Sequence, residues 1–243
     1  MNKTLIYIFI FSLCCFAVQA QGTGNSEEVS GLDSLVYQER YGLRIGTDVA
    51  MLARTLFDKN YTGFEIQGDY RYDKSLYFAA EIGNESYDYN HPYLDVGTEG
   101  SYLKLGINYN SFENLLGMQN ELYVGFRYGF STFTQKLYQY IIYNDDNYFP
   151  IDIRRPNTEY SGLTAHFAQM QLGIKTEVFH NVFLGVYAQI NYLVTAQQPD
   201  NFDNLYIPGF NRTYDSSSFG VGWGYSISYL IPIVKKERRK SLK

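Results

Sequence analysis

The chain has little cysteine and little histidine, and it has no long apolar run after its first 20 residues. Its two cysteines, Cys14 and Cys15, lie within that first segment, and it has three histidines. Once that segment is removed, the remainder can form neither disulfides nor a Cys/His metal cluster. A transmembrane helix needs about 20 consecutive apolar residues, and no later stretch offers them. No nucleophile elbow, phosphate loop or zinc-protease motif is present, so the common enzyme signatures are missing.

The first 20 residues are predicted to be a secretory signal peptide. Lys3 provides a positive start, residues 5–18 are apolar, and Val18 and Ala20 are small residues at the expected cleavage site before Gln21. An N-terminal membrane anchor is the alternative, but the apolar run is short for a membrane span. We therefore expect export, followed by a flexible leader in the periplasm over residues 21–40.

Charge is unevenly distributed along the chain. The whole sequence has a net charge of −5, whereas the last nine residues, "KKERRKSLK", hold six basic residues and one glutamate. The rest is therefore strongly acidic, which argues against nucleic acid as a partner. We expect residues 235–243 to form a basic periplasmic tail.

Aromatic residues, by contrast, are abundant at 18% of the chain, and they fall in alternating segments. In "YTGFEIQGDYRY", residues 61–72, apolar and polar side chains take opposite parities, as in a strand with two different faces. Similar segments span residues 41–51, 61–72, 76–88, 99–110, 121–133, 163–178, 182–195 and 217–233. No segment has a convincing helical period.

The connections between these segments are also sorted by length. Those after the second, fourth and sixth segments are short, and those after the third, fifth and seventh are longer, which is typical of outer-membrane barrels. The first connection, residues 52–60, is the exception, because it is brief although it belongs to the long set. Folding the second segment onto the third about Lys74 places Arg71 opposite Tyr77 and Gln67 opposite Glu81. Folding the sixth onto the seventh places Val178 opposite Val182. The predicted fold is all-β: an eight-stranded antiparallel up-and-down transmembrane β-barrel over residues 41–234.

The two parities indicate which face is outside. One parity carries nearly thirty large apolar residues, which would overfill the narrow interior of an eight-stranded barrel. The other carries glycines and charged residues of both signs, which could pair inside. We therefore predict that the apolar parity faces lipid, whereas a water-soluble, lipocalin-like barrel would point it inward. The predicted interior network is Arg44, Asp48, Glu65, Asp69, Arg71, Glu81, Glu85, Lys104, Arg127, Lys175 and Glu177.

Few residues are candidates for chemistry. His166 is the one histidine inside a predicted strand, with Ser161 and Glu159 close in sequence, so it is the weak candidate for a catalytic residue at the membrane surface. An interfacial, aromatic-like role beside the outer loops is the preferred interpretation, because a motif without its structural context is weak. The stretches "YNDDN" and "PDNFDN" suit calcium but suit turns better, because the spaced ligands of a calcium loop are missing. No metal or cofactor is predicted.

The long loops carry aromatic residues that could form an outward binding surface, or could instead pack the loops shut. These residues are Tyr140, Tyr143, Tyr148, Phe202, Tyr206 and Phe210.

Several phrases together resemble a known family. They are "VYQERYGLRIGTDV", "FDKNYTGFEIQGDY", "LYVGFRYGFSTF", "GLTAHF", "PDNFDNLYIPGFN" and "SYLIPIVKK", spread from Val36 to Lys236. The chain resembles a family of outer-membrane β-barrel proteins from Bacteroidota-type bacteria, catalogued as a domain of unknown function. The resemblance implies a barrel in the outer membrane. It implies no activity and no catalytic residue.

The first functional hypothesis is a small outer-membrane barrel with a structural or surface-interaction role and long extracellular loops, and not an enzyme. The expected partners are outer-membrane lipid, the barrel-assembly machinery during biogenesis, and a surface partner that the sequence does not identify. One alternative is a barrel enzyme that modifies lipid A or phospholipid acyl chains through His166. Another is a barrel that binds a small ligand or forms a narrow pore.

Overall fold

A computed structural model describes residues 34–112, 118–142, 152–200, 202–214 and 216–241, with side chains described between residues 39 and 236. The predicted signal peptide lies outside the described residues. The chain divides into two units, Met1–Val36 with Arg239–Lys243, and Tyr37–Arg238. The contacts described here belong to the second unit.

The protein is built almost entirely of antiparallel strands. The elements are β1 (Ser34–Asp48), α2 (Val49–Phe57), β2 (Tyr61–Arg71), β3 (Leu76–His91), β4 (Leu94–Asn110), β5 (Glu121–Ile142), β6 (Asp152–Arg154), β7 (Thr158–Phe179), β8 (Val182–Ala196), β9 (Tyr206–Ile207), β10 (Asn211–Arg212) and β11 (Phe219–Ser241). No helix in the described part of the chain is long and apolar enough to cross a membrane.

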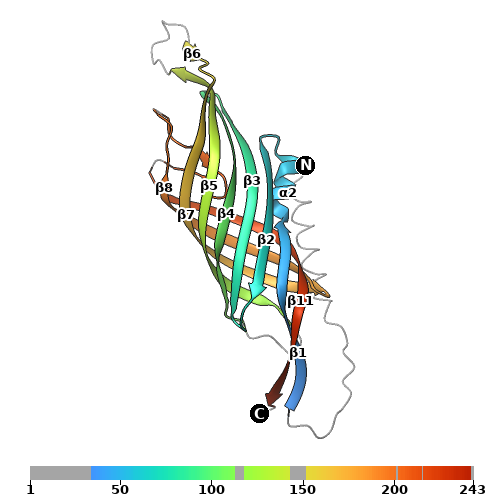
Figure 1. Ribbon diagram of the computed structural model, residues 1–243. Helices are drawn as coiled ribbons and strands as arrows, with labels where there is room; N and C mark the ends of the chain where they lie inside the picture. The colour runs from blue at the N-terminus through green and yellow to red at the C-terminus, as the bar shows by residue number, and fades with distance from the viewer. Residues whose placement is uncertain (1–33, 113–117, 143–151, 201, 215, 242–243) are drawn as a thin grey trace. The chain divides into compact units, whose positions relative to one another are not determined.

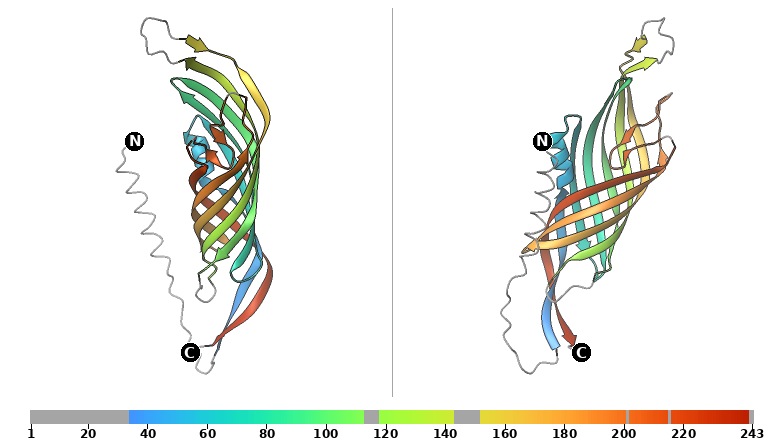
Figure 2. Two further views of the ribbon diagram at one scale, coloured as in Figure 1. Left: turned by 90° about the vertical axis from the view of Figure 1, so that its left-hand side faces the viewer. Right: turned by 180° about the vertical axis from the view of Figure 1, so that it is seen from behind.

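The main sheet turns back on itself. Its strand order is β4-β3-β2-β1-β11-β8-β7-β5-β6, and β4 also pairs with β5 (Figure 1). The sheet is therefore an up-and-down, barrel-like ring, with β6 attached to β5 outside it. In Figure 2 the orange and red strands β8 and β11 lie side by side, as their pairing requires. We call the end of the ring where β2 begins the loop side, and the opposite end the turn side.

The register of the first predicted hairpin is confirmed, because Arg71 pairs with Tyr77 and Gln67 with Glu81. In the second hairpin a β-bulge near Glu177 shifts the end of the strand, so that Phe179, and not Val178, pairs with Val182. The bulge leaves the pairs closer to the strand centre, such as Ile174 with Val186, as predicted.

The two parities differ sharply in exposure. Phe64 and Ile66 are 49% and 44% exposed, whereas the intervening Glu65 is 2% exposed. The same contrast runs round the ring, so the interior is polar and the exterior is an apolar band. The exposed apolar residues include Phe78, Ile82, Leu103, Leu105, Leu122, Phe126, Met170, Leu172, Leu184, Val186, Ile190, Trp223 and Tyr225.

One helix differs from the sequence-based prediction. Residues 49–57 form α2, although the alternation predicts a strand for residues 49–51 and a loop for the rest. Asp48 caps the helix by accepting a hydrogen bond of 3.0 Å from the backbone N–H of Met51. The sequence "VAMLARTLF" after the cap is rich in strong helix formers. The cap and the local propensity together explain why the chain leaves the sheet at this point.

Several strands are longer than predicted. β3 runs to His91 and β4 begins at Leu94, so the expected loop over residues 89–98 is a tight turn. At the ends of the chain, β1 begins at Ser34 within the expected leader, and β11 continues to Ser241 within the expected tail.

The connection between β8 and β11 folds into the ring. Ile207 and Phe210 are buried in an apolar cluster with Phe133, Ala165 and Phe167, and the rings of Phe167 and Phe210 lie 5.7 Å apart. Tyr206 and Phe210, expected on an outward binding surface, are therefore buried, because the β9–β10 hairpin points inward. This apolar cluster therefore occupies part of the loop side of the interior.

Gly209 is the point on which this hairpin turns. Its φ of +79° is in the left-handed region, and a Cβ there would lie 2.6 Å from the ring of Tyr102. We predict that Gly209→Ala destabilises the fold by roughly 1–3 kcal/mol from the backbone alone, and by more through the clash. Thermal unfolding in detergent, followed by heat-dependent gel mobility, measures the change.

Gly162→Ala is the matched control, since Gly162 has a φ of +72° but nothing within 4 Å of the added Cβ. Equal losses of stability in the two variants would contradict the tight packing of the hairpin against Tyr102.

Candidate functional site

Two ion clusters fill the middle of the ring. In the first, nearer the turn side, Arg44 lies 2.6 Å from Asp69 and 2.5 Å from Glu121, and Lys175 lies 2.6 Å from the other oxygen of Asp69. All four are nearly inaccessible to solvent. Burial of a charge this deep is costly unless the charge has a partner of opposite sign, and each of these four has one.

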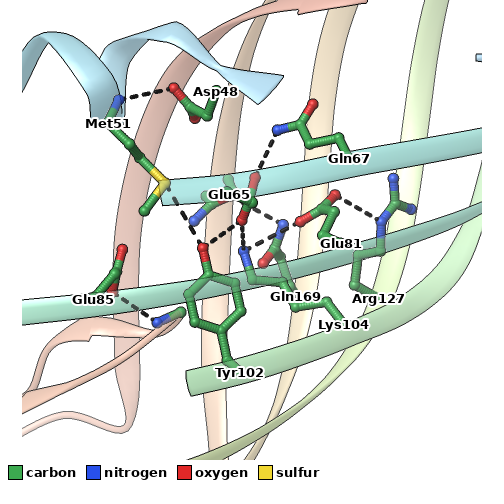
Figure 3. Close-up of polar contacts among 12 residues, drawn as sticks. Asp48, Met51, Glu65, Gln67, Glu81, Glu85, Tyr102, Lys104, Arg127 and Gln169 are labelled. Atoms are coloured by element: carbon green, nitrogen blue, oxygen red, sulfur yellow. Dashed lines mark hydrogen bonds and ion pairs between the residues drawn. The ribbon is translucent and has the colours of Figure 1, made fainter. Parts of the chain in front are cut away.

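The second cluster lies one level closer to the loop side. Lys104 bridges Glu65 at 3.3 Å and Glu81 at 3.2 Å, and Arg127 reaches Glu81 at 3.1 Å (Figure 3). Tyr102 donates a hydrogen bond of 2.6 Å to Glu65. The two cations and two carboxylates come from neighbouring strands β2 to β5, so the cluster joins four strands across the interior.

The remaining members of the predicted network lie at its two ends. Toward the turn side, Arg71 is 3.5 Å from Glu39, and Glu177 is 2.6 Å from Arg40. Toward the loop side lie Asp48, which accepts a hydrogen bond from Tyr187, and Glu85. Glu121 is absent from the predicted network, although it has the interior parity at the start of its segment.

Glu85 fastens the inward-folded hairpin to the wall. It accepts hydrogen bonds from the Tyr61 hydroxyl at 2.9 Å, the Tyr206 hydroxyl at 2.8 Å and the Gly209 backbone N–H at 2.9 Å. Burial raises the pKa of Tyr206 well above its usual value, so its hydroxyl keeps the proton that it donates. The alternation of the sequence places Glu85 in the interior, but it does not predict that Glu85 binds the β9–β10 hairpin.

Strand β1 ends before its two neighbours do. A Cβ added to Gly46 would collide with the carbonyl oxygen of Ile227, so these residues are adjacent across the β1–β11 pair. β1 ends two residues later, at Asp48. Antiparallel geometry therefore leaves residues 219–224 of β11 beyond the end of β1. Residues 61–64 of β2 lie beyond it on the other side, because Thr47 pairs with Ile66.

Helix α2 occupies this gap but is hydrogen-bonded to one side of it. Thr55 Oγ1 accepts from the backbone N–H of Gly63 at 2.8 Å and lies 3.1 Å from the Gly63 carbonyl oxygen. Thr47 donates a hydrogen bond of 2.6 Å to the carbonyl of Glu65. Within the described ranges, no hydrogen bond joins α2 to β11. Hydrogen bonds therefore connect α2 to β2, whereas the hydrogen-bonded wall of the ring is interrupted between α2 and β11.

A cavity of about 940 Å³, here called the seam pocket, opens at this interruption. One side is α2, and the other is the outward face of β11, whose Trp223 is 70% exposed. The pocket reaches inward-facing residues as well, so it connects the apolar exterior with the polar interior. Its lining includes Ala50, Met51, Ala53, Arg54 and Phe57 of α2, Val221, Trp223 and Tyr225 of β11, and the interior residues Asp48, Glu65, Glu85, Tyr102, Lys104 and Tyr187.

His166 lies among aromatic residues. Its Nδ1 is 3.0 Å from the Tyr128 hydroxyl, and its ring lies 5.0 Å from that of Phe130. Glu159 reaches Lys136, at 4.0 Å. The structure does not bring Ser161 or Glu159 to His166 within the part of the chain that it describes, so it assembles no triad there.

The other predicted loop residues are dispersed. Tyr140 is partly exposed on β5 and Phe202 is half-buried, whereas Tyr143 and Tyr148 lie outside the described residues. The stretch "YNDDN" lies outside them too. In the residues that the structure describes, no group of three or more His, Cys, Asp or Glu side chains could hold a metal ion.

These observations define a class of protein: an antiparallel, up-and-down, barrel-like ring with an apolar exterior, an ion-paired interior and a pocket in its wall. The chain belongs to the family described as domain of unknown function DUF6048, whose profile matches residues 1–236. The family resemblance drawn from the sequence is thereby confirmed.

Two solved structures are similar to the chain. Neisserial surface protein A (NspA) is 13% identical, with a TM-score of 0.38, over 82% of this chain and 99% of NspA. Ail, the attachment invasion locus protein of Yersinia pestis, is 12% identical, with a TM-score of 0.37, over 81% of this chain and 96% of Ail. At this identity the likeness concerns the fold alone. No curated protein matches the chain.

The ion cluster around Lys104 offers a direct test of the interior. Lys104→Met leaves Glu65 buried without a cation, and loss of one partner of a buried ion pair costs about 3–5 kcal/mol. We predict a loss of stability of that order, measured by unfolding in detergent. Lys104→Met combined with Glu65→Gln should recover part of it, because the unpaired charge is then removed.

Lys136→Met serves as the control, since Lys136 makes an exposed pair with Glu159. An exposed pair contributes little to stability, so this variant should unfold almost like the wild type. Equal effects of the Lys104 and Lys136 substitutions would contradict the buried ion cluster around Lys104.

Proposed function

We propose that the protein is an eight-stranded, closed transmembrane β-barrel of an outer membrane that acts as a binding protein, with its binding site in the seam pocket. Export through a cleaved signal peptide and insertion by the barrel-assembly machinery are part of this proposal. The observation that carries it is the seam pocket itself, which opens onto the same apolar band that would contact lipid.

The exposed apolar band supports the membrane location. A water-soluble protein rarely leaves contiguous apolar patches beyond a few hundred Å² on its surface. Here every strand of the ring presents exposed residues such as Phe64, Leu105, Phe126 and Leu172. In a bilayer this band is solvated by acyl chains, and the paired strands satisfy the backbone polar groups, as a spanning segment requires.

The interior supports binding over conduction. Ion clusters around Arg44 and Lys104 fill the middle of the ring, and the β9–β10 hairpin fills its loop side with Ile207 and Phe210. A narrow barrel filled by side chains has no open aqueous channel. The seam pocket is different, because a volume of about 940 Å³ lies at the upper end of the roughly 300–1,000 Å³ of small-molecule sites.

A surface-interaction role is the second candidate. Tyr138, Tyr140 and Ile142 of β5 are exposed on the long β5–β6 extension. Ile153 of β6 is exposed on the other face of this two-stranded ribbon from Tyr140 and Ile142, because it pairs with Ile141. Exposed aromatic residues on such an extension suit contact with another protein. The inward position of Tyr206 and Phe210 removes two of the residues expected to share this role.

Binding can be followed through Trp223, which is the only tryptophan of the chain and lines the seam pocket. We predict that a single-chain amphiphile, titrated at low concentration into the protein in a nanodisc, changes the fluorescence of Trp223. The change should reach a plateau as the site fills. Ala53→Phe, which narrows the pocket, should abolish the saturable change. Ala80→Phe, on the exposed outer face of β3, should leave it intact. A linear, unsaturable response in the wild type would contradict a binding site.

Membrane insertion and sealing have their own measurement. The mature protein should require detergent for extraction, shift its gel mobility on heating, and give no discrete current in a planar bilayer. Fractionation with soluble periplasmic proteins would overturn the membrane assignment. A discrete current would contradict the proposal that the interior is closed to ions.

A further inference from the structure

The seam pocket has a polar end and an apolar end. At the loop side, the guanidinium of Arg54 lies 3.8 Å above the centre of the Tyr61 ring. The guanidinium of Arg212, from β10, lies 5.8 Å from that of Tyr89. Both arginines line the pocket. The apolar part of the lining includes Met51 and Ala53 of α2 and Trp223 of β11.

The charges of the pocket favour an anion at the rim and disfavour one deeper. Arg54 pairs with Asp58 at 3.3 Å, but both side chains are 39% exposed, and an exposed pair of this kind is weak. Deeper in the pocket, the three hydrogen bonds to Glu85 come from neutral groups, so its charge would repel an anion there. A negatively charged head group is therefore held at the loop side, where the arginines can donate charge-assisted hydrogen bonds to it.

The apolar part of the pocket is continuous with the exterior of the ring. Val221 and Trp223 are 72% and 70% exposed and belong to the outward parity of β11. The upper part of β11 also has no strand partner on its α2 side within the described residues. A strand edge in a bilayer must be covered by protein, by water or by a ligand, because unpaired backbone groups are costly in hydrocarbon. An acyl chain arriving from the bilayer can lie beside α2 without leaving hydrocarbon.

We propose, resting on the proposed function, that the seam pocket binds one phosphate-bearing lipid of the surrounding bilayer. Its phosphate is held by Arg54 and Arg212 at the loop side, and one acyl chain lies between α2 and β11. An anionic phosphate lipid suits this rim better than a zwitterionic one, because the two guanidinium groups then meet no cation of the head group.

The test uses the full mature chain in vesicles of equal parts phosphatidylglycerol and phosphatidylcholine, released into the gas phase for native mass spectrometry. We expect one retained phosphatidylglycerol per chain. Arg54→Gln combined with Arg212→Gln should reduce the retained phosphatidylglycerol about tenfold or more, since each lost charged hydrogen bond weakens binding by roughly that factor. The variant should also lose the advantage of phosphatidylglycerol over phosphatidylcholine, because no guanidinium is left to favour an anionic head group. Arg154→Gln, on β6 away from the pocket, should retain the preference.

Ala53→Phe should lose the retained lipid altogether, while Ala80→Phe keeps it. Heat-dependent gel mobility shows for each variant that the barrel is folded. Retention of both lipids in equal amounts would overturn the preference for an anionic head group. Phosphatidylglycerol retention unchanged by the two arginine substitutions would overturn the assignment of the phosphate to Arg54 and Arg212. If the lipid experiment fails in this way but the fluorescence of Trp223 still changes saturably, the seam pocket remains a binding site, for instance for a free amphiphile. If the wild type shows neither retained lipid nor a saturable fluorescence change, both the lipid assignment and the proposed binding function are overturned.

Discussion

The structure depends on one constraint: backbone N–H and C=O groups must be hydrogen-bonded wherever the chain lacks access to water. The ring meets it by joining each strand to a neighbour on both sides, with β4 paired to β5 and β1 to β11. The interior depends on the same rule applied to charge, since Lys104 and Arg127 neutralise Glu65 and Glu81. Pairing stops at the end of β1, at Asp48, and this is where the pocket lies.

Helix α2 is the consequence of that interruption. Asp48 ends the strand and caps the helix, and the same side chain accepts a hydrogen bond from Tyr187 across the interior. The Thr55 hydroxyl then accepts the hydrogen bond from the backbone N–H of Gly63 that a neighbouring strand would otherwise accept. A single residue thus joins the strand, the helix and the opposite wall. Residues of the polar interior and of the exposed side of β11 line the same cavity.

Period-two alternation predicts most of the ring, because each face of a strand meets one environment. It places Glu65 and Asp69 inside and Phe64 and Ile66 outside, and it sets the register of the β2–β3 hairpin. It does not predict α2, since the short run "VAM" suits a strand or a helix, and the capping role of Asp48 is recognisable only once the helix after it is known. It does not predict the inward hairpin either. Glu85 holds Tyr206 and Gly209 across more than 120 residues of sequence, and local pattern carries no information about such contacts.

The outward direction of the apolar parity is the central claim, and site-directed spin labelling measures it most directly. A cysteine introduced at Leu105 or at Gln67 would be the only one in the chain after loss of the predicted signal peptide, which contains Cys14 and Cys15. In lipid vesicles, a nitroxide at Leu105 should collide frequently with oxygen dissolved in the acyl chains and rarely with a water-soluble nickel complex. A label at Gln67 should show low oxygen accessibility. The reverse pattern, with Gln67 facing the acyl chains and Leu105 shielded from them, would contradict the account.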